Sequence, residues 1–174
     1  MKWWRKLFVP LVFVVGPGVG AVPAASLEYE VKASYLYNFI QFIDWPEDAF
    51  DNGDFNICVL GTDRFGTALD VLHGESAGRR VVRVQRFDRA GAAAGARCHV
   101  MFVSRTEDSA QVLQMVVHKA VLTVGEAPGF TAHGGVINLV EGQGRIRFHV
   151  NVKAAQRAGL TVSSRLLKLA VDQR

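Results

Sequence analysis

One stretch, residues 29–46 with the sequence YEVKASYLYNFIQFIDWP, most constrains what this chain can fold into. At the helical increment of 100° per residue, its apolar residues fall into two neighbouring stripes. The stripes consist of Tyr29, Ala33, Leu36, Ile40 and Ile43, and of Val31, Tyr35, Phe39 and Phe42. The combined apolar arc of roughly 200° is about twice what an ordinary surface helix needs, so this helix must be covered from two sides.

Two kinds of cover remain open for the second, aromatic stripe. A sheet and a neighbouring helix of the same domain would bury it internally, whereas a subunit or partner interface would bury it on association. Glu28 and Lys32 interrupt the apolar side near its start. Ser26 is the predicted N-cap of the helix. Pro46 disfavours a helical conformation at Trp45, so the helix is expected to end near Ile43.

The N-terminal residues read as an export signal. Lys2, Arg5 and Lys6 precede the apolar run of residues 7–15, and small residues suited to a signal peptidase follow at residues 22–24. We therefore expect residues 1–24 to be a signal peptide and residues 25–174 to form one exported domain, with a retained N-terminal anchor as the alternative. Without residues 1–24 the net charge falls from +4 to +1, because three of the 20 basic and none of the 16 acidic residues lie there. A charge this small gives no support to a nucleic-acid partner.

Export also determines how the two cysteines are interpreted. In an oxidising compartment, an even pair such as Cys58 and Cys98 favours a disulfide. On the chain-entropy model, closing the loop between residues 58 and 98 stabilises the fold by roughly 4 kcal/mol. The spacing does not match the CxxC of a redox catalyst or a zinc site.

The chain after the first helix predicts an α/β fold. Strand-like apolar runs at residues 55–60, 80–87, 99–103 and 120–124 alternate with helical segments. Residues 136–140 and 145–151 then form a hairpin pattern. We expect a single domain with a mixed, mostly parallel sheet of about six strands. It should end in a C-terminal antiparallel hairpin, carry helices on both faces and follow the strand order second, first, third at its start.

Catalytic and metal-binding patterns are sparse. The sequence contains no nucleophile elbow, phosphate loop or zinc-protease helix, and its five histidines are not paired at helical ligand spacing. We predict no enzyme activity, no metal and no cofactor. On one face of the second hairpin strand, Arg145, Arg147 and His149 could hold a carboxylate, a phosphate or a partner's acidic side chains; the alternative is a solvated sheet face.

Three segments together resemble the YfiR family of periplasmic proteins. They are YNFIQFIDWP ending at Pro46, FNICVLGTDRFG at residues 55–66, and GGVINLVEGQGRIRFHVNVKAAQRAGLTVSSRLLKLA at residues 134–170. The resemblance extends from Glu28 to Ala170. It implies an exported α/β protein, located in the periplasm, that binds the periplasmic domain of an inner-membrane diguanylate cyclase, or a related envelope sensor, and represses it. Envelope signals such as redox state would relieve that repression, raise cyclic-di-GMP and favour biofilm formation.

The resemblance also assigns residues. The positions that match the family's aromatic helix motif, and are our candidate partner interface, are Tyr35, Phe39, Phe42, Trp45 and Pro46. Cys58 and Cys98 match a family disulfide position, but with a single pair this chain cannot carry a switch that needs further cysteines. A homodimer would use the same aromatic stripe and would compete with a partner for it. The alternative function is a small-anion sensor acting through Arg145, Arg147 and His149.

Overall fold

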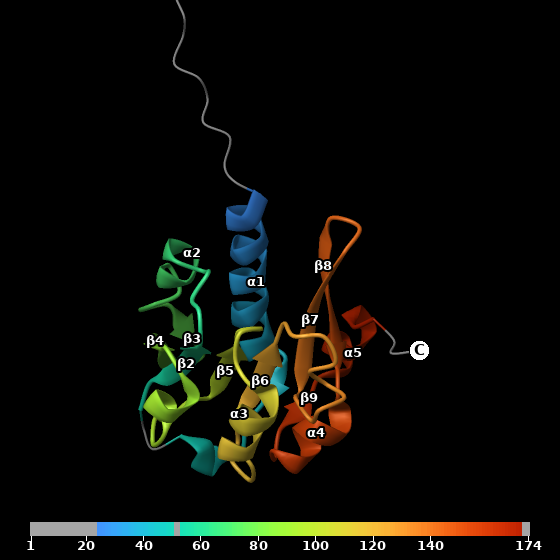
Figure 1. Cartoon of the computed structure of the whole chain (residues 1–174). Coiled ribbons are helices and arrows are strands. Elements are labelled where there is room, and N and C mark those ends of the chain that lie inside the picture. Colours follow the sequence, from blue (N-terminus) through green and yellow to red (C-terminus); the bar gives the residue numbers. More distant parts are fainter. Residues whose placement is uncertain (1–23, 51–52, 172–174) are drawn as a thin grey trace, which may run out of the picture.

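The computed structural model describes residues 24–50 and 53–171, and the side chains of the first helix from Leu27 onward. The predicted signal peptide therefore lies outside the described residues except for Ala24. Figure 1 shows one long helix beside a curled sheet, with the C-terminal elements gathered at the end of the sheet formed by β7 and β8.

The main sheet has seven strands in the order β3-β4-β2-β5-β6-β7-β8. Their bounds are β2 (Phe55–Leu60), β3 (Ser76–Ala77), β4 (Arg80–Phe87), β5 (Val100–Val103), β6 (Leu122–Gly125), β7 (Ile137–Gly142) and β8 (Arg145–Val150). Strands β4, β2, β5, β6 and β7 are parallel, whereas β3 and β8 pair antiparallel at the two edges. The predicted fold class, the order second-first-third and the terminal hairpin are confirmed. Strand β3 was not predicted.

Helices cover both faces of the sheet, as predicted. Their bounds are α1 (Ala24–Ile40), η1 (Glu47–Ala49), α2 (Thr67–Asp70), η2 (Ala90–Ala93), α3 (Ser109–Met115), α4 (Val152–Arg157) and α5 (Ser164–Leu169). One core cluster joins α1, α2, α4 and α5 to one face, and a second joins η2 and α3 to the other. Strand residues alternate between these clusters: Ile57 and Val59 contact the α1 side, whereas Cys58 and Leu60 contact the α3 side.

The first helix differs from the prediction at both ends. It begins at Ala24, so Ser26 lies inside it and is not its N-cap, and it ends at Ile40 and not near Ile43. Residues Ile43–Asp44 form strand β1, which pairs antiparallel with β9 (Thr161–Val162) in a separate two-stranded sheet. Ile43 nevertheless remains buried, because the strand places its side chain in the same core that the helix was expected to reach.

Three of the shorter helices, α3, α4 and α5, begin at side-chain caps. Asp108 accepts hydrogen bonds from the backbone N–H groups of Ala110 and Gln111 at the start of α3. Asn151 caps α4 through Ala154, and Ser163 caps α5. These contacts satisfy amide groups that a helix leaves without partners in its first turn.

Candidate partner-binding site

The inner stripe of α1 belongs to the core. Tyr29, Ala33, Leu36 and Ile40 are all buried and pack against the sheet. This confirms the prediction that one of the two apolar stripes faces the chain's own sheet.

The second stripe divides between core and surface. Phe39 is only 1% exposed and lies edge-on to Phe148 of β8, with ring centroids 5.2 Å apart. Tyr35 is half-buried: its ring contacts Phe148 at 5.5 Å, and its hydroxyl donates to the carbonyl of Ile146 at 3.2 Å. Strand β8 therefore provides the second cover for much of this stripe. Phe39 is a core residue in this structure and has almost no surface to offer a partner.

The other three predicted interface residues are half-buried at the base of α1. Trp45 lies edge-on to Phe55, with centroids 5.1 Å apart. Its indole N–H is buried, and among the described residues it has no hydrogen-bond acceptor. Phe42 packs against the core near β9, where its carbonyl accepts from the amide of Ser163, and the Pro46 ring lies near Gly159. Tyr35, Phe42, Trp45 and Pro46 thus retain some exposed surface.

An apolar surface that the sequence revealed only in part, through Val31 of the second stripe, lies near the N-terminal turns of α1. Leu27 is 59% exposed and Val31 is 37% exposed. These two side chains form one wall of a groove of about 490 Å³, and the tip of the β7–β8 hairpin forms the other. The hairpin wall contributes Glu141, Gly144, Arg145 and Ile146. Figure 1 shows the hairpin projecting beside α1. We call this the α1–hairpin groove. It forms only because the hairpin lies beside α1 in the folded chain, and periodicity along α1 does not indicate that position.

Behind this groove, α1 is tied to the sheet by buried charges. The Lys32 ammonium lies 2.5 Å from a carboxylate oxygen of Glu126, and the two side chains are 2% and 1% exposed. Lys32 also pairs with Glu28, while the Tyr29 hydroxyl donates to Glu126 at 2.9 Å. The interruption of the apolar side by Lys32 was a signal in the sequence, but nothing there identified Glu126 as its partner.

The pKa values of these groups follow from their contacts. Burial alone would raise the pKa of Glu126, but hydrogen bonds and charge from Lys32, with the Tyr29 hydroxyl and the Arg105 amide, outweigh burial and lower it. Burial alone would lower the pKa of Lys32, but hydrogen bonds to Glu126 and Glu28 raise it. Both groups are therefore charged, and the pair holds α1 rigidly at the carboxyl end of β6.

The predicted basic cluster on β8 is only partly assembled. Arg145 and Arg147 are exposed, and Arg147 donates to the Gln143 side chain at 3.4 Å. His149 is half-buried, and its Nδ1 lies 2.9 Å from the carbonyl of Val171. The C-terminal segment thus occupies one nitrogen of His149. Arg145 instead lines the α1–hairpin groove.

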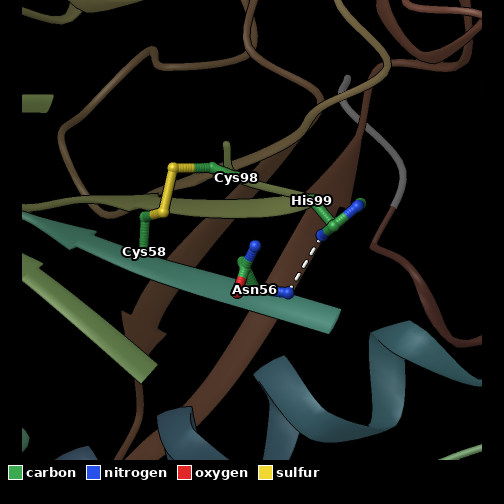
Figure 2. Close-up of a disulfide and its surroundings, with 4 residues drawn as sticks. All are labelled: Asn56, Cys58, Cys98 and His99. Carbon is green, nitrogen blue, oxygen red and sulfur yellow. Dashed lines mark hydrogen bonds between the residues drawn. A yellow bond between two sulfur atoms is a disulfide. The ribbon is translucent and has the colours of Figure 1, made fainter. Parts of the chain in front are cut away.

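The predicted disulfide is present. Cys58 in β2 and Cys98 just before β5 are bonded with their Cα atoms 5.7 Å apart, and both residues are buried (Figure 2). Because β2 and β5 are neighbouring parallel strands, the bond joins the amino-terminal part of β5 to the centre of the sheet.

Next to the disulfide, His99 is held as a neutral ring. Its Nδ1 accepts from the amide of Asn56 at 2.9 Å (Figure 2), so the proton lies on Nε2, which donates to the carbonyl of Ala49 at 3.2 Å. Burial lowers the pKa of His99; the bond to Ala49 opposes this shift, whereas the charges of Arg80 and Arg97 add to it. His99 therefore serves as an anchor between η1 and β5.

Other kinds of site were sought in the described part of the chain. Among residues 24–50 and 53–171, no three His, Cys, Asp or Glu side chains lie close enough to hold a metal ion. Within the same residues, no helix is both long enough and apolar enough to span a membrane. What these residues do present is a disulfide-linked α/β domain with a partly apolar groove along its longest helix.

Comparison with known proteins identifies the family to which this domain belongs. Residues 29–171 match the family described as YfiR/HmsC-like, and the chain therefore belongs to that family. Known members are regulatory proteins of the periplasm that act in cyclic-di-GMP signalling, in general through a diguanylate cyclase partner.

More distant comparisons bear on the fold alone. No curated protein matches the chain significantly. Among solved structures, the chain is similar to a conserved domain protein from Vibrio cholerae O1 biovar El Tor strain N16961, with a TM-score of 0.52 and 11% identity. That likeness covers 84% of this chain but only 60% of the other.

Proposed function

We propose that this chain is a periplasmic repressor that binds the periplasmic domain of an inner-membrane diguanylate cyclase, or a related envelope sensor, and holds it inactive. The observation that carries the proposal is the α1–hairpin groove. Leu27 and Val31 expose apolar surface there, and charged side chains surround it. Interfaces of this kind combine an apolar centre with a polar rim.

The proposed interface follows α1 along its length. Tyr35 and Phe42 extend the apolar surface from the groove toward the base of the helix, and Trp45 and Pro46 lie beyond them. The indole N–H of Trp45 is buried, so Trp45 would contact a partner through the part of the residue that remains exposed and not through this donor. Phe39 is assigned a supporting role, since it holds Tyr35 and Phe148 in place from behind.

Homodimer formation through the same surface would compete with the partner. Export directed by residues 1–24, which are then removed, would bring the domain into the periplasm and allow the Cys58–Cys98 bond to form. Anion sensing by Arg145, Arg147 and His149 is the second candidate function. It is favoured by one observation, that Arg145 lines the groove, so an anion there would contact the proposed interface directly.

The proposed function is tested by cellular cyclic-di-GMP in a strain whose native gene is replaced by Val31→Glu. We expect cyclic-di-GMP to rise to the level of a gene deletion, because a carboxylate in an apolar interface is desolvated without a partner. The matched control is Val71→Glu, since Val71 is 68% exposed and lies outside the groove. If Val31→Glu leaves cyclic-di-GMP at the wild-type level while the protein is folded and abundant, the groove is not the repressing surface.

A further inference from the structure

A cavity lies on the face of the sheet opposite α1, under the amino ends of β5 and β6. Its volume is about 360 Å³, within the range of roughly 300–1,000 Å³ typical of small-molecule sites. Its wall includes Cys98, so it adjoins the disulfide shown in Figure 2. It is separate from the α1–hairpin groove, with which it shares no lining residue.

The floor of the cavity is apolar and adaptable. Met101 and Met115 line it, together with Val116 and Val121. None of its lining residues among those described is Phe, Tyr or Trp. The His99 imidazole also lines it, but that ring already stacks on Phe50 at 4.5 Å and is held by hydrogen bonds to Asn56 and Ala49. Methionine side chains are flexible and fill irregular spaces, and an unbranched aliphatic chain is the ligand body that fits such a floor.

The rim of the cavity is predominantly basic. Arg97 and Lys119 line it, against a single carboxylate from Asp48. A smaller adjoining cavity of about 220 Å³ shares Val116 and Val121, and its lining includes Arg157 but no carboxylate. The electrostatic balance around this opening therefore favours an anionic head group.

Lys119 is held at this rim by a constrained turn. His118 has a φ of 61°, in the left-handed region that residues other than glycine seldom adopt. Backbone hydrogen bonds fix the turn on both sides, from Lys119 to Val116 at 3.0 Å and from Val121 to Lys119 at 2.8 Å. Backbone strain of this kind concentrates at functional sites, where it orients particular side chains.

We propose that this cavity binds a small amphipathic carboxylate, with an unbranched aliphatic chain on the methionine floor and its carboxylate paired with Lys119. This site is additional to the proposed partner interface, because it lies on the other face of the sheet. Ligand bound there contacts the Cys98 end of the disulfide and supports the turn between α3 and β6.

The two methionines on the floor provide a direct test. The chain has three methionines, and the remaining one, Met1, precedes the described residues. Oxidised protein carrying ¹³C-methyl methionine is titrated with octanoate and, separately, with its neutral isostere octanamide. We expect the Met101 and Met115 resonances to shift along one saturation curve with octanoate, and octanamide to bind at least about tenfold more weakly.

Three variants complete the test. Lys119→Gln is expected to weaken octanoate binding by about fivefold and to leave octanamide unchanged. Met115→Trp, which fills the cavity, is expected to abolish the shifts of the Met101 resonance with octanoate and with octanamide. Thermal unfolding of this variant checks that it is folded. Lys168→Gln, on exposed α5 outside the cavity, is the control and should bind octanoate as the wild type does. The proposal is overturned if octanoate leaves both methionine resonances unmoved, or if octanamide binds as tightly as octanoate.

Discussion

Lys32 of α1 and Glu126, which follows β6, form an ion pair 2.5 Å apart with both side chains almost fully buried. A pair of this kind fixes geometry more than it adds stability, since desolvation of two charges offsets most of their attraction. Removing one member of the pair is costly, because the other charge stays buried without its closest counter-charge. The position of α1, and with it the α1–hairpin groove, depends on this contact.

Replacing Lys32 with Met should therefore be strongly destabilising. We expect a loss of about 3–5 kcal/mol in the free energy of unfolding, measured by urea denaturation, because the buried Glu126 carboxylate loses its closest cation and keeps only the Tyr29 hydroxyl and the more distant Arg105. The double variant Lys32→Met with Glu126→Gln should recover part of this loss. Lys168→Met on the exposed surface is the control. A single-variant loss below about 1 kcal/mol would mean that the pair does not hold α1 in place.

The same carboxylate predicts how stability depends on acid. The pKa of Glu126 is lower in the folded protein than the ordinary glutamate value of about 4.3, so the unfolded chain takes up this proton first. The contribution of Glu126 to the free energy of unfolding is fully present at a pH above the ordinary glutamate pKa. It is lost as the pH falls below that value and through the lowered pKa of the folded state. We expect Glu126→Gln to have a flatter decline in unfolding free energy than the wild type below about pH 4.5. Parallel curves for the two proteins would show that Glu126 does not carry this linkage.

Removing the disulfide tests the second constraint on the sheet. The Cys58–Cys98 bond closes a separation of 40 residues, and the double variant Cys58→Ala with Cys98→Ala should lose about 4 kcal/mol. Equilibrium unfolding in urea measures the loss, and dithiothreitol-treated wild type should behave like the variant. A variant as stable as the oxidised wild type would show that the sheet does not need this bond.

Close packing around Phe130 gives a prediction about two glycines. A Cβ atom at Gly125 would lie 2.4 Å from the Phe130 ring, and one at Gly135 would lie 2.1 Å from it. Gly125→Ala should destabilise the protein by about 1–3 kcal/mol, since the ring is fully buried and has little room to move. Gly142→Ala is the matched control, because nothing lies within 4 Å of its Cβ position. Equal thermal unfolding midpoints for the two variants would contradict this account.

The features that could be predicted from the sequence depend on short-range patterns of apolar and polar residues. Strand–helix alternation along the chain was enough to predict the fold class and the strand order. The disulfide was predicted from the export signal and the even number of cysteines. These features need only short-range periodicity and general rules of topology.

Contacts between distant segments explain what the sequence missed. Strand β1 exists because Phe42 and Ser163 meet across the fold, which no periodicity within residues 29–46 indicates. Phe39 was assigned to an interface because it matches the family's aromatic helix motif. The residue that covers it, Phe148, lies on β8, and nothing in the helix sequence indicates this contact. Leu27, in contrast, belongs to neither apolar stripe of the first helix. Its place in the α1–hairpin groove is seen only when the position of the hairpin is known.

The most direct test of the central proposal is the affinity between this protein and the purified periplasmic domain of an inner-membrane diguanylate cyclase from the same genome. Isothermal titration calorimetry would compare wild type, Val31→Glu and the control Val71→Glu. We expect Val31→Glu to raise Kd at least about tenfold, because it places a charge in the apolar centre of the interface, and Val71→Glu to leave Kd unchanged. Equal affinity of all three proteins would contradict the assignment of the α1–hairpin groove as the partner-binding surface.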